Sequence, residues 1–396
     1  MIQISPETQL FIREHSSDDV RTLALQAKKY PDINMPTAIT QIAGRQVAAE
    51  KIPSWREIEE IWYPKHLSLE QCSSEITARY KARLFQGDSL TDLTGGFGID
   101  CSFLATGFKS ATYVERQEEL CEIAAHNFPI LNLNHINVRN EDGVAYLQTM
   151  SPVDCIFLDP ARRNEHGGKT VAISDCEPNV AELEALLLSK ANRVMIKLSP
   201  MLDLSLALKE LKQTQEVHIL SVNNECKELL ILLGQTSPAE ISIHCVNLFT
   251  KGTQKEQHFV FTREQEQCSE CTYTDSLETY LYEPNASLLK AGAFRSIAAA
   301  YPVRKLHPNS HLYTSDTFIE NFPGRIFRIV NQCSFNKKEV KENLADLKKA
   351  NVTVRNFPAT VAELRKRLHL TEGGDTYLFA STLNNGQKVI IRCEKV

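Results

Sequence analysis

Between residues 72 and 232, short apolar segments of strand length alternate with amphipathic segments of helical spacing. Strands are expected at 89–95, 110–116, 135–141, 153–160 and 193–200. Strands that alternate with helices are typical of a parallel, doubly wound α/β sheet of the Rossmann type. Such sheets bind their ligands beyond the carboxyl ends of the strands. Functional residues are therefore expected at those ends.

The same patterns divide the chain into four segments. Residues 1–65 favour helices, and residues 66–276 hold the strand–helix alternation and end in a hairpin expected within 241–264. Residues 277–322 are expected to form an irregular or small α+β connecting module. Residues 323–396 read as strand, helix, strand, helix, strand and strand, which predicts a small α+β domain with its own core.

Composition excludes several classes of protein. The 396 residues include 23% charged and 42% hydrophobic residues, which is ordinary for a globular protein and unlike a collagen or a wholly disordered chain. No apolar stretch approaches the roughly 20 residues of a membrane span, and the first residues offer no secretory signal. The 11 cysteines are an odd number and are expected to be reduced thiols, so a cytoplasmic protein is expected.

The sequence patterns typical of metal-binding sites are weak in this chain. Cys268 and Cys271 form a lone CxxC pair, whereas a structural zinc site usually needs four ligands. His126 and His135 stand in no metal-binding spacing. We therefore expect no metal.

The first expected strand runs into the turn DLTGGFGID at 92–100. Gly96 and Gly98 would let the backbone approach a ligand without a Cβ in the way. The dinucleotide fingerprint needs a third glycine where Cys101 stands, and the lysine of a phosphate-binding loop is absent. A carboxylate at Asp92 repels phosphate but attracts an ammonium group. S-adenosylmethionine carries an ammonium and a sulfonium but no phosphate, so this turn fits it better than a dinucleotide.

Three later strands also end in acidic residues. Glu115 lies about 20 residues beyond Gly96, where a carboxylate can accept hydrogen bonds from both ribose hydroxyls. Asp142 could accept a hydrogen bond from an adenine amino group, or could cap a turn. Asp159 follows the fourth strand, where capping of the next segment is the alternative. These acidic ends are expected to line one site.

On these residues, 66–235 resembles the class I S-adenosylmethionine-dependent methyltransferases. The resemblance implies a glycine-rich cofactor loop in which Thr94 stands where the family often has a glycine. It also implies that 159–163 lie beside the transferred methyl group. Thr77 is a further candidate contact of the methionyl part, with helix capping as the alternative. The cofactor-binding residues expected are Asp92, Thr94, Gly96, Gly98, Asp100, Glu115, Asp142, Asp159 and Thr77.

The residues around Asp159 limit the chemistry. Enzymes that methylate base amino groups usually have an aromatic residue where this chain has Arg162, so base stacking is lost, although a guanidinium can stack or contact phosphate. Covalent catalysis on pyrimidine carbon is not expected, because no cysteine follows Lys197 at the next strand end. Catalysis by alignment remains, with Asp159, Lys197 and Arg162 as catalytic candidates. The alternative is that Lys197 pairs with Asp159, and Arg162 anchors the chain, for structure alone.

The C-terminal part resembles the THUMP-like domain that follows such methyltransferase domains in a bacterial group. The resemblance lies in EPNASLLKAGAF (283–294), KLHPNSHLYTSD (305–316) and RNFPATVAELRKRLHLTEGGDTYLFA (355–380). True THUMP domains belong to RNA-modifying enzymes. Residues 320–396 carry 14 basic and 8 acidic residues, a net of +6, against −11 for the preceding 319 residues. RNA is therefore the expected partner. The alternatives are a solvated helical surface, a small-molecule methyltransferase and a non-catalytic S-adenosylmethionine-binding module.

Overall fold

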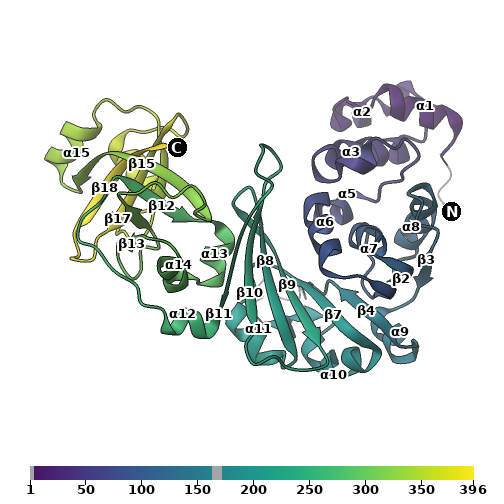
Figure 1. Cartoon of the computed structure of the whole chain (residues 1–396). Helices are drawn as coiled ribbons and strands as arrows, with labels where there is room; N and C mark the ends of the chain where they lie inside the picture. The colour runs from purple at the N-terminus through teal and green to yellow at the C-terminus, as the bar shows by residue number, and fades with distance from the viewer. Residues whose placement is uncertain (1–3, 163–171) are drawn as a thin grey trace. The chain divides into compact units, whose positions relative to one another are not determined.

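The structure is a computed structural model that describes residues 4–162 and 172–396. The chain forms two compact units (Figure 1). The first comprises Met1–Gln215 and Leu229–Pro238, and the second comprises Glu216–Glu228 and Ala239–Val396. Within the described part, no helix is both long and apolar enough to cross a membrane.

The first unit begins with helices, as expected. They are α1 (Pro6–Glu14), α2 (Val20–Leu25), α3 (Met35–Lys51), α4 (Pro53–Arg56), α5 (His66–Gln71) and α6 (Glu75–Leu84). The helical pattern of 11–27 is split in two because Asp19 accepts the N–H of Thr22 and starts α2 as its N-cap. Phe11, Leu23 and Ile42 are buried together and join α1, α2 and α3.

A nine-stranded sheet follows, in the order β11-β10-β8-β9-β7-β4-β1-β2-β3. Its strands are β1 (Gly87–Asp92), β2 (Phe108–Glu115), β3 (Ile136–Asn140), β4 (Val153–Leu158), β7 (Ala191–Leu198), β8 (Thr214–Val222), β9 (Glu225–Gly234), β10 (Ser242–Leu248) and β11 (Glu256–Thr262). The neighbours from β3 through β2, β1 and β4 to β7 are all parallel, which confirms the doubly wound prediction.

The parallel pattern ends at β9, which runs antiparallel to β7. Asn223 and Asn224 connect β8 to β9 and have φ angles of 49° and 68°. A two-residue turn with positive φ can join only antiparallel neighbours. The expected hairpin is also present, because β10 pairs antiparallel with β11.

Helices connect the parallel strands: α7 (Ile99–Ala105), α8 (Glu118–Ile130), α9 (Gly143–Thr149), α10 (Val180–Lys190) and α11 (Leu204–Glu210). Two short strands, β5 (Ala161–Arg162) and β6 (Cys176–Glu177), pair beyond β4. Because the chain goes from β1 to β2 on one side and to β4 on the other, the order of strands reverses between β1 and β4. The carboxyl ends of β1 and β4 are therefore where a doubly wound sheet binds ligands.

The second unit contains a seven-stranded sheet in the order β13-β14-β12-β15-β18-β17-β16. Its strands are β12 (Tyr280–Pro284), β13 (Arg304–Lys305), β14 (Tyr313–Ser315), β15 (Gly324–Ser334), β16 (Asn351–Val354), β17 (Thr376–Thr382) and β18 (Lys388–Lys395). The expected order of strands and helices after 323 is confirmed. Residues 277–322 are α+β rather than irregular, since three of their segments join the same sheet.

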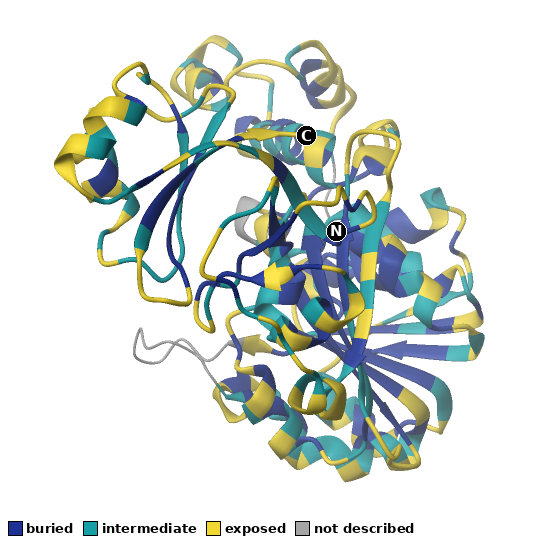
Figure 2. Ribbon diagram, turned by 60° about the vertical axis from the view of Figure 1, so that its left-hand side comes forward, coloured by how far each residue is buried: buried dark blue, intermediate teal, exposed yellow. Residues whose placement is uncertain are grey.

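Five helices accompany this sheet: α12 (Arg263–Cys268), α13 (Ala286–Ala291), α14 (Phe294–Ala300), α15 (Lys337–Leu344) and α16 (Val361–Leu368). Leu344 of α15 and Leu364 of α16 are buried. Val340 of α15 and Leu368 of α16 are partly buried against the same core cluster, whereas the lysines of both helices are exposed (burial classes are coloured in Figure 2). The polar faces of α15 and α16 are thus left to solvent.

Packing of α3 onto the following chain depends on a glycine. A Cβ on Gly44 would lie 2.3 Å from the Cβ of Tyr63, whose side chain is buried. Tyr63 cannot retreat, because the amide of Gln41 exchanges two 2.9 Å hydrogen bonds with its backbone.

Gly44→Ala is therefore expected to lower the free energy of unfolding by about 1–3 kcal/mol, as overpacking does, although alanine favours helix by roughly 1 kcal/mol. Urea unfolding followed by circular dichroism measures the difference. The exposed Glu50→Ala on the same helix is the control and should stay within about 0.5 kcal/mol of wild type. An unchanged or more stable Gly44→Ala protein would show that this contact is loose.

Candidate functional site

Asp92 is the last residue of β1, and its side chain is buried, with 1% of the residue exposed. Its Oδ1 accepts the backbone N–H of Thr94 at 3.0 Å. Its Oδ2 is equally enclosed, and within the described part of the chain no group donates a hydrogen bond to it. A buried carboxylate oxygen without a donor is costly, so this atom points to a missing cationic or donor partner.

The surroundings of Asp92 disfavour its charge. Burial raises the pKa of this carboxyl to about 8, and the nearby Asp100 and Asp159 act in the same direction, against the Thr94 N–H and Lys197. Without a ligand, Asp92 is therefore mostly protonated at neutral pH. A bound ammonium group would favour the ionised form instead.

The turn after Asp92 has no side chains at Gly96 and Gly98 to cover its backbone. Gly96 and Gly98 have φ angles of +53° and +86°, a conformation that glycine adopts without strain. A Cβ on Gly96 would meet nothing closer than the Thr94 carbonyl oxygen at 3.8 Å. The Tyr113 hydroxyl donates to the Gly96 carbonyl at 2.5 Å and holds the turn in place. A ligand can thus approach the turn at Gly96.

Glu115 ends β2 and lies against the same turn. Its Oε2 accepts the Gly96 N–H, and its Oε1 accepts the Gln117 N–H, both at 2.9 Å. A carboxylate oxygen has two acceptor positions, so each oxygen can accept one more hydrogen bond. The structure therefore brings Asp92, Gly96 and Glu115 together.

Asp142 has the capping role that the sequence left open. It is the exposed N-cap of α9, and its Oδ1 accepts the N–H groups of Val144 and Ala145 at 2.9 and 3.0 Å. Contact of Asp142 with an adenine stays a prediction.

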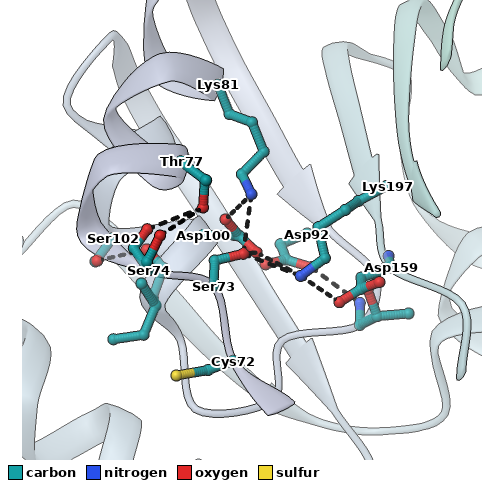
Figure 3. Close-up of polar contacts among 12 residues, drawn as sticks. Cys72, Ser73, Ser74, Thr77, Lys81, Asp92, Asp100, Ser102, Asp159 and Lys197 are labelled. Atoms are coloured by element: carbon teal, nitrogen blue, oxygen red, sulfur yellow. Dashed lines mark hydrogen bonds and ion pairs between the residues drawn. The ribbon is translucent and has the colours of Figure 1, made fainter. Parts of the chain in front are cut away.

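Asp100 lies in the first turn of α7 between two lysines (Figure 3). Its carboxylate oxygens are 2.9 Å from the Nζ of Lys81 and 3.2 Å from the Nζ of Lys197, and the Ser73 hydroxyl donates to it at 2.7 Å. Burial alone would raise the pKa of Asp100, but Lys197 and Lys81 outweigh burial and hold the pKa well below its usual range. Asp100 is therefore ionised and held by the protein itself.

Lys197, near the end of β7, extends this network to β4. Its Nζ is 2.6 Å from Oδ2 of Asp159, and the backbone N–H of Asp159 donates to the Thr94 hydroxyl at 2.6 Å. Burial raises the pKa of Asp159, Asp100 raises it further, and Lys197 lowers it. The Asp159 side chain is 36% exposed, whereas those of Lys197 and Asp100 are 10% exposed. Asp159 is thus the group of the network that can reach a substrate.

The remaining predicted residues are less informative. Thr77, on α6, is buried and donates its hydroxyl to the Ser74 carbonyl at 3.0 Å, which is a local helix contact. The backbone of Arg162 belongs to β5, but its side chain, like the whole of Arg163, lies outside the described residues. Contact of either arginine with a substrate stays a prediction.

Sequence reasoning missed Lys81 and the role of Ser73. Lys81 is 0% exposed, and its Nζ also donates to the Ser73 hydroxyl at 2.9 Å. One signal was present: Lys81 lies four residues after Thr77 and three after Ala78, on the buried face of α6. A lysine on an apolar helical face needs a buried acidic partner, and Asp100 is that partner.

The doubly wound sheet and its strand order are those of the class I methyltransferase fold. Family models match the C-terminal part, one described as a ferredoxin-like domain at residues 280–323 and one as THUMP domain-like at residues 324–395. The whole chain is similar to the whole of a crystal structure named a "putative methyltransferase" from Porphyromonas gingivalis W83, with 34% sequence identity and a TM-score of 0.88. The chain belongs to this family of methyltransferases with a THUMP-like C-terminal domain.

Weaker similarities cover only part of the chain. An rRNA methylase from Streptococcus thermophilus matches 40% of this chain and 94% of its own, with 13% identity and a TM-score of 0.31. A "putative methyltransferase" from Streptococcus mutans in complex with SAH matches 40% and 96%, with 13% identity and a TM-score of 0.30. Similarities this weak carry no argument about function. No curated protein matches the chain.

Asp92 makes stability depend on pH. Its pKa is about 8 in the folded protein and about 3.9 in an unfolded chain. Because the folded state binds the extra proton between these values, the stability that Asp92 contributes is present below pH 4 and is lost as pH rises to 8. An asparagine side chain at this position would not titrate.

Asp92→Asn is therefore expected to be more stable than wild type, by roughly 2–4 kcal/mol at pH 8, and by less at pH 5. Urea unfolding of both proteins at pH 5, 6, 7 and 8 measures this difference, and subtraction cancels the groups that both share. A difference that does not grow with pH would contradict a buried, protonated Asp92.

Proposed function

We propose that this protein transfers a methyl group from S-adenosylmethionine, with RNA as the acceptor. The observation that carries the cofactor assignment is the buried Oδ2 of Asp92, which has no donor within the described part of the chain and lies at the end of β1 beside the glycine turn. This atom fits the ammonium group of the cofactor. The absence of a third glycine and of a phosphate-loop lysine argues against a phosphorylated ligand.

The other cofactor contacts follow from the geometry of the turn. Gly96 and Gly98 would let the cofactor lie against the backbone. Glu115 has one acceptor position left on each oxygen, which suits the two ribose hydroxyls. Asp142 would face the adenine, and Thr77 and Thr94 would lie near the methionyl part. The bound cofactor supplies a methyl group that a sulfonium makes electrophilic.

Methyl transfer in this proposal needs alignment more than covalent chemistry. Asp159 is the exposed member of the ion network, and its raised pKa makes it a better proton acceptor than an ordinary aspartate. It would orient the acceptor group and take its proton. Lys197 fixes the Asp159 carboxylate at 2.6 Å and thereby sets its direction. Arg162, three residues beyond Asp159, would contact phosphate or stack on a base.

The RNA assignment is supported by the charge of the C-terminal domain. Residues 324–395 match a THUMP domain-like model, and THUMP domains belong to RNA-modifying enzymes. Exposed basic residues concentrate on and around α15 and α16: Lys337, Lys338, Lys341, Lys348, Lys349, Lys366 and Arg367. Lysines exposed on these two helices provide a surface on which phosphates can displace counterions.

The cofactor assignment is tested by calorimetry with S-adenosylhomocysteine. Wild type should bind one equivalent, and Glu115→Gln should weaken binding by roughly 10–100-fold, because two charge-assisted ribose hydrogen bonds become weaker. Glu118→Gln, an exposed change at the start of α8, is the matched control and should bind like wild type. No heat with wild type would remove the cofactor assignment.

The RNA assignment is tested by filter binding of transfer RNA and ribosomal RNA fragments at several salt concentrations. The triple variant Lys338→Glu, Lys341→Glu, Lys366→Glu should lose affinity and flatten the slope of log K against log salt by about 2, if all three lysines contact phosphates of a single strand. The control reverses three exposed lysines elsewhere, Lys29, Lys209 and Lys212. If both triple variants bind RNA equally, a small-molecule methyltransferase becomes the better-supported hypothesis.

A further inference from the structure

Three histidines and a glutamate gather on one face of β8, β10 and β11, all within the second unit. Within the described part of the chain, Glu216, His218 and His244 form the one group of metal-ligating side chains found, and their ligand atoms all lie within 4.8 Å of one another. The Oε2 of Glu216 is 3.2 Å from Nε2 of His218 and 4.0 Å from Nε2 of His244. The site described above uses none of these residues.

Strand pairing explains why residues far apart in sequence meet here. In the parallel pair β8–β10, His218 stands opposite His244, and Glu216 stands opposite Ser242. Residues two apart on a strand share a face, so Glu216 and His218 point the same way. On β11, His258 stands opposite Val246, two residues beyond His244, and therefore shares this face.

We infer that Glu216, His218 and His244 form a binding site for a divalent transition metal of the zinc type. Imidazole nitrogens and carboxylate oxygens are the ligands that zinc takes besides cysteine. Zinc bonds of about 2.1 Å in a tetrahedron place ligand atoms about 3.4 Å apart, and the observed 3.2 and 4.0 Å lie close to this spacing. The imidazole rings of His218 and His244 are stacked, with centroids 4.3 Å apart and 17° between their planes, so one ring has to turn for both nitrogens to face the same ion.

Exposure within the group suits a metal that enters from solvent. The side chain of His218 is 3% exposed, that of His244 20% and that of Glu216 45%. His218 is thus the most buried of the three ligands, and Glu216 is the most exposed. Three protein ligands leave a fourth position open to water or another ligand, as in zinc sites that are not purely structural.

His258 is a positioning residue for this site. Its Nε2 lies 3.1 Å from Nδ1 of His244, so it can accept the proton on Nδ1 while Nε2 of His244 faces the metal. Histidine ligands usually donate their second nitrogen to such a partner, which fixes the tautomer.

The sequence predicted no metal, because it contains no set of metal ligands at close spacing along the chain. These ligands lie 26 and 28 residues apart, at 216, 218 and 244, and only the register of β8 against β10 brings them together. The CxxC pair, Cys268 and Cys271, is not part of this group.

The test uses the full chain without a histidine tag, in a Cys268→Ser, Cys271→Ser background so that this thiol pair cannot bind metal. After treatment with a chelator and desalting, Zn²⁺ is titrated in competition with a chromophoric chelator. One equivalent should bind per chain. His244→Gln and Glu216→Gln should each weaken binding by at least about 100-fold, and His258→Gln by roughly 10–100-fold.

The exposed His369→Asn is the matched control, because its φ of 55° is tolerated by asparagine, and it should bind zinc like wild type. Co²⁺ provides a second readout: a visible band of a four- or five-coordinate site, without thiolate charge transfer, should appear in wild type and be lost in Glu216→Gln. Substoichiometric zinc binding by wild type overturns the proposal, and so does an affinity that none of the three cluster variants changes.

Discussion

Two buried ammonium groups organise the candidate active site. Lys81 from α6 and Lys197 from β7 meet at Asp100 on α7, and Lys197 continues to Asp159 after β4. Lys81 and Lys197 match Asp100 and Asp159 in number and in charge type, which leaves Asp92 as the carboxyl without a cationic partner. In a buried setting such a carboxyl keeps its proton. Asp92 therefore lacks a cationic partner. The ammonium group of a ligand could take the place of the proton on Asp92.

The glycine-rich loop differs from the family pattern at Thr94, and contacts of the loop explain this difference. Thr94 stands where the family often has glycine, and its hydroxyl accepts the backbone N–H of Asp159 at 2.6 Å. This bond ties the end of β1 to the end of β4. The strict need for glycine falls on the next residue instead, because a Cβ on Gly95 would lie 2.3 Å from the Tyr113 ring. The side chain of Thr94 is therefore needed for this hydrogen bond, whereas any side chain at Gly95 would clash with Tyr113.

Sequence patterns predicted the features that depend on local periodicity. The parallel strands, the tail domain and the positions of Asp92, Glu115 and Asp159 at strand ends all follow from apolar segments and their boundaries. Features that depend on pairing between distant segments were missed. The pairing of β9 with β7, the joining of segments from 277–322 to the C-terminal sheet, the burial of Lys81 and the meeting of His218 with His244 depend on a strand register that cannot be read from the sequence. The sequence could not decide the role of Asp142, because helix capping and ligand binding both favour an aspartate at the end of a strand.

The basic residues of the C-terminal domain fall into two groups with different roles. Its arginines largely hold structure: Arg325 and Arg355 both bind the buried Glu283, and Arg392 pairs with Asp346. Asp346 offsets the charge of Arg392, and Glu283 offsets one of the two arginines that bind it, so the positive charge exposed to solvent lies mainly on the lysines on and around α15 and α16. At physiological ionic strength, charges act over only about 8 Å. The negative charge elsewhere on the chain therefore does not cancel these lysines for a polyanion that touches them, and an overall net charge of −5 remains compatible with an RNA-binding face.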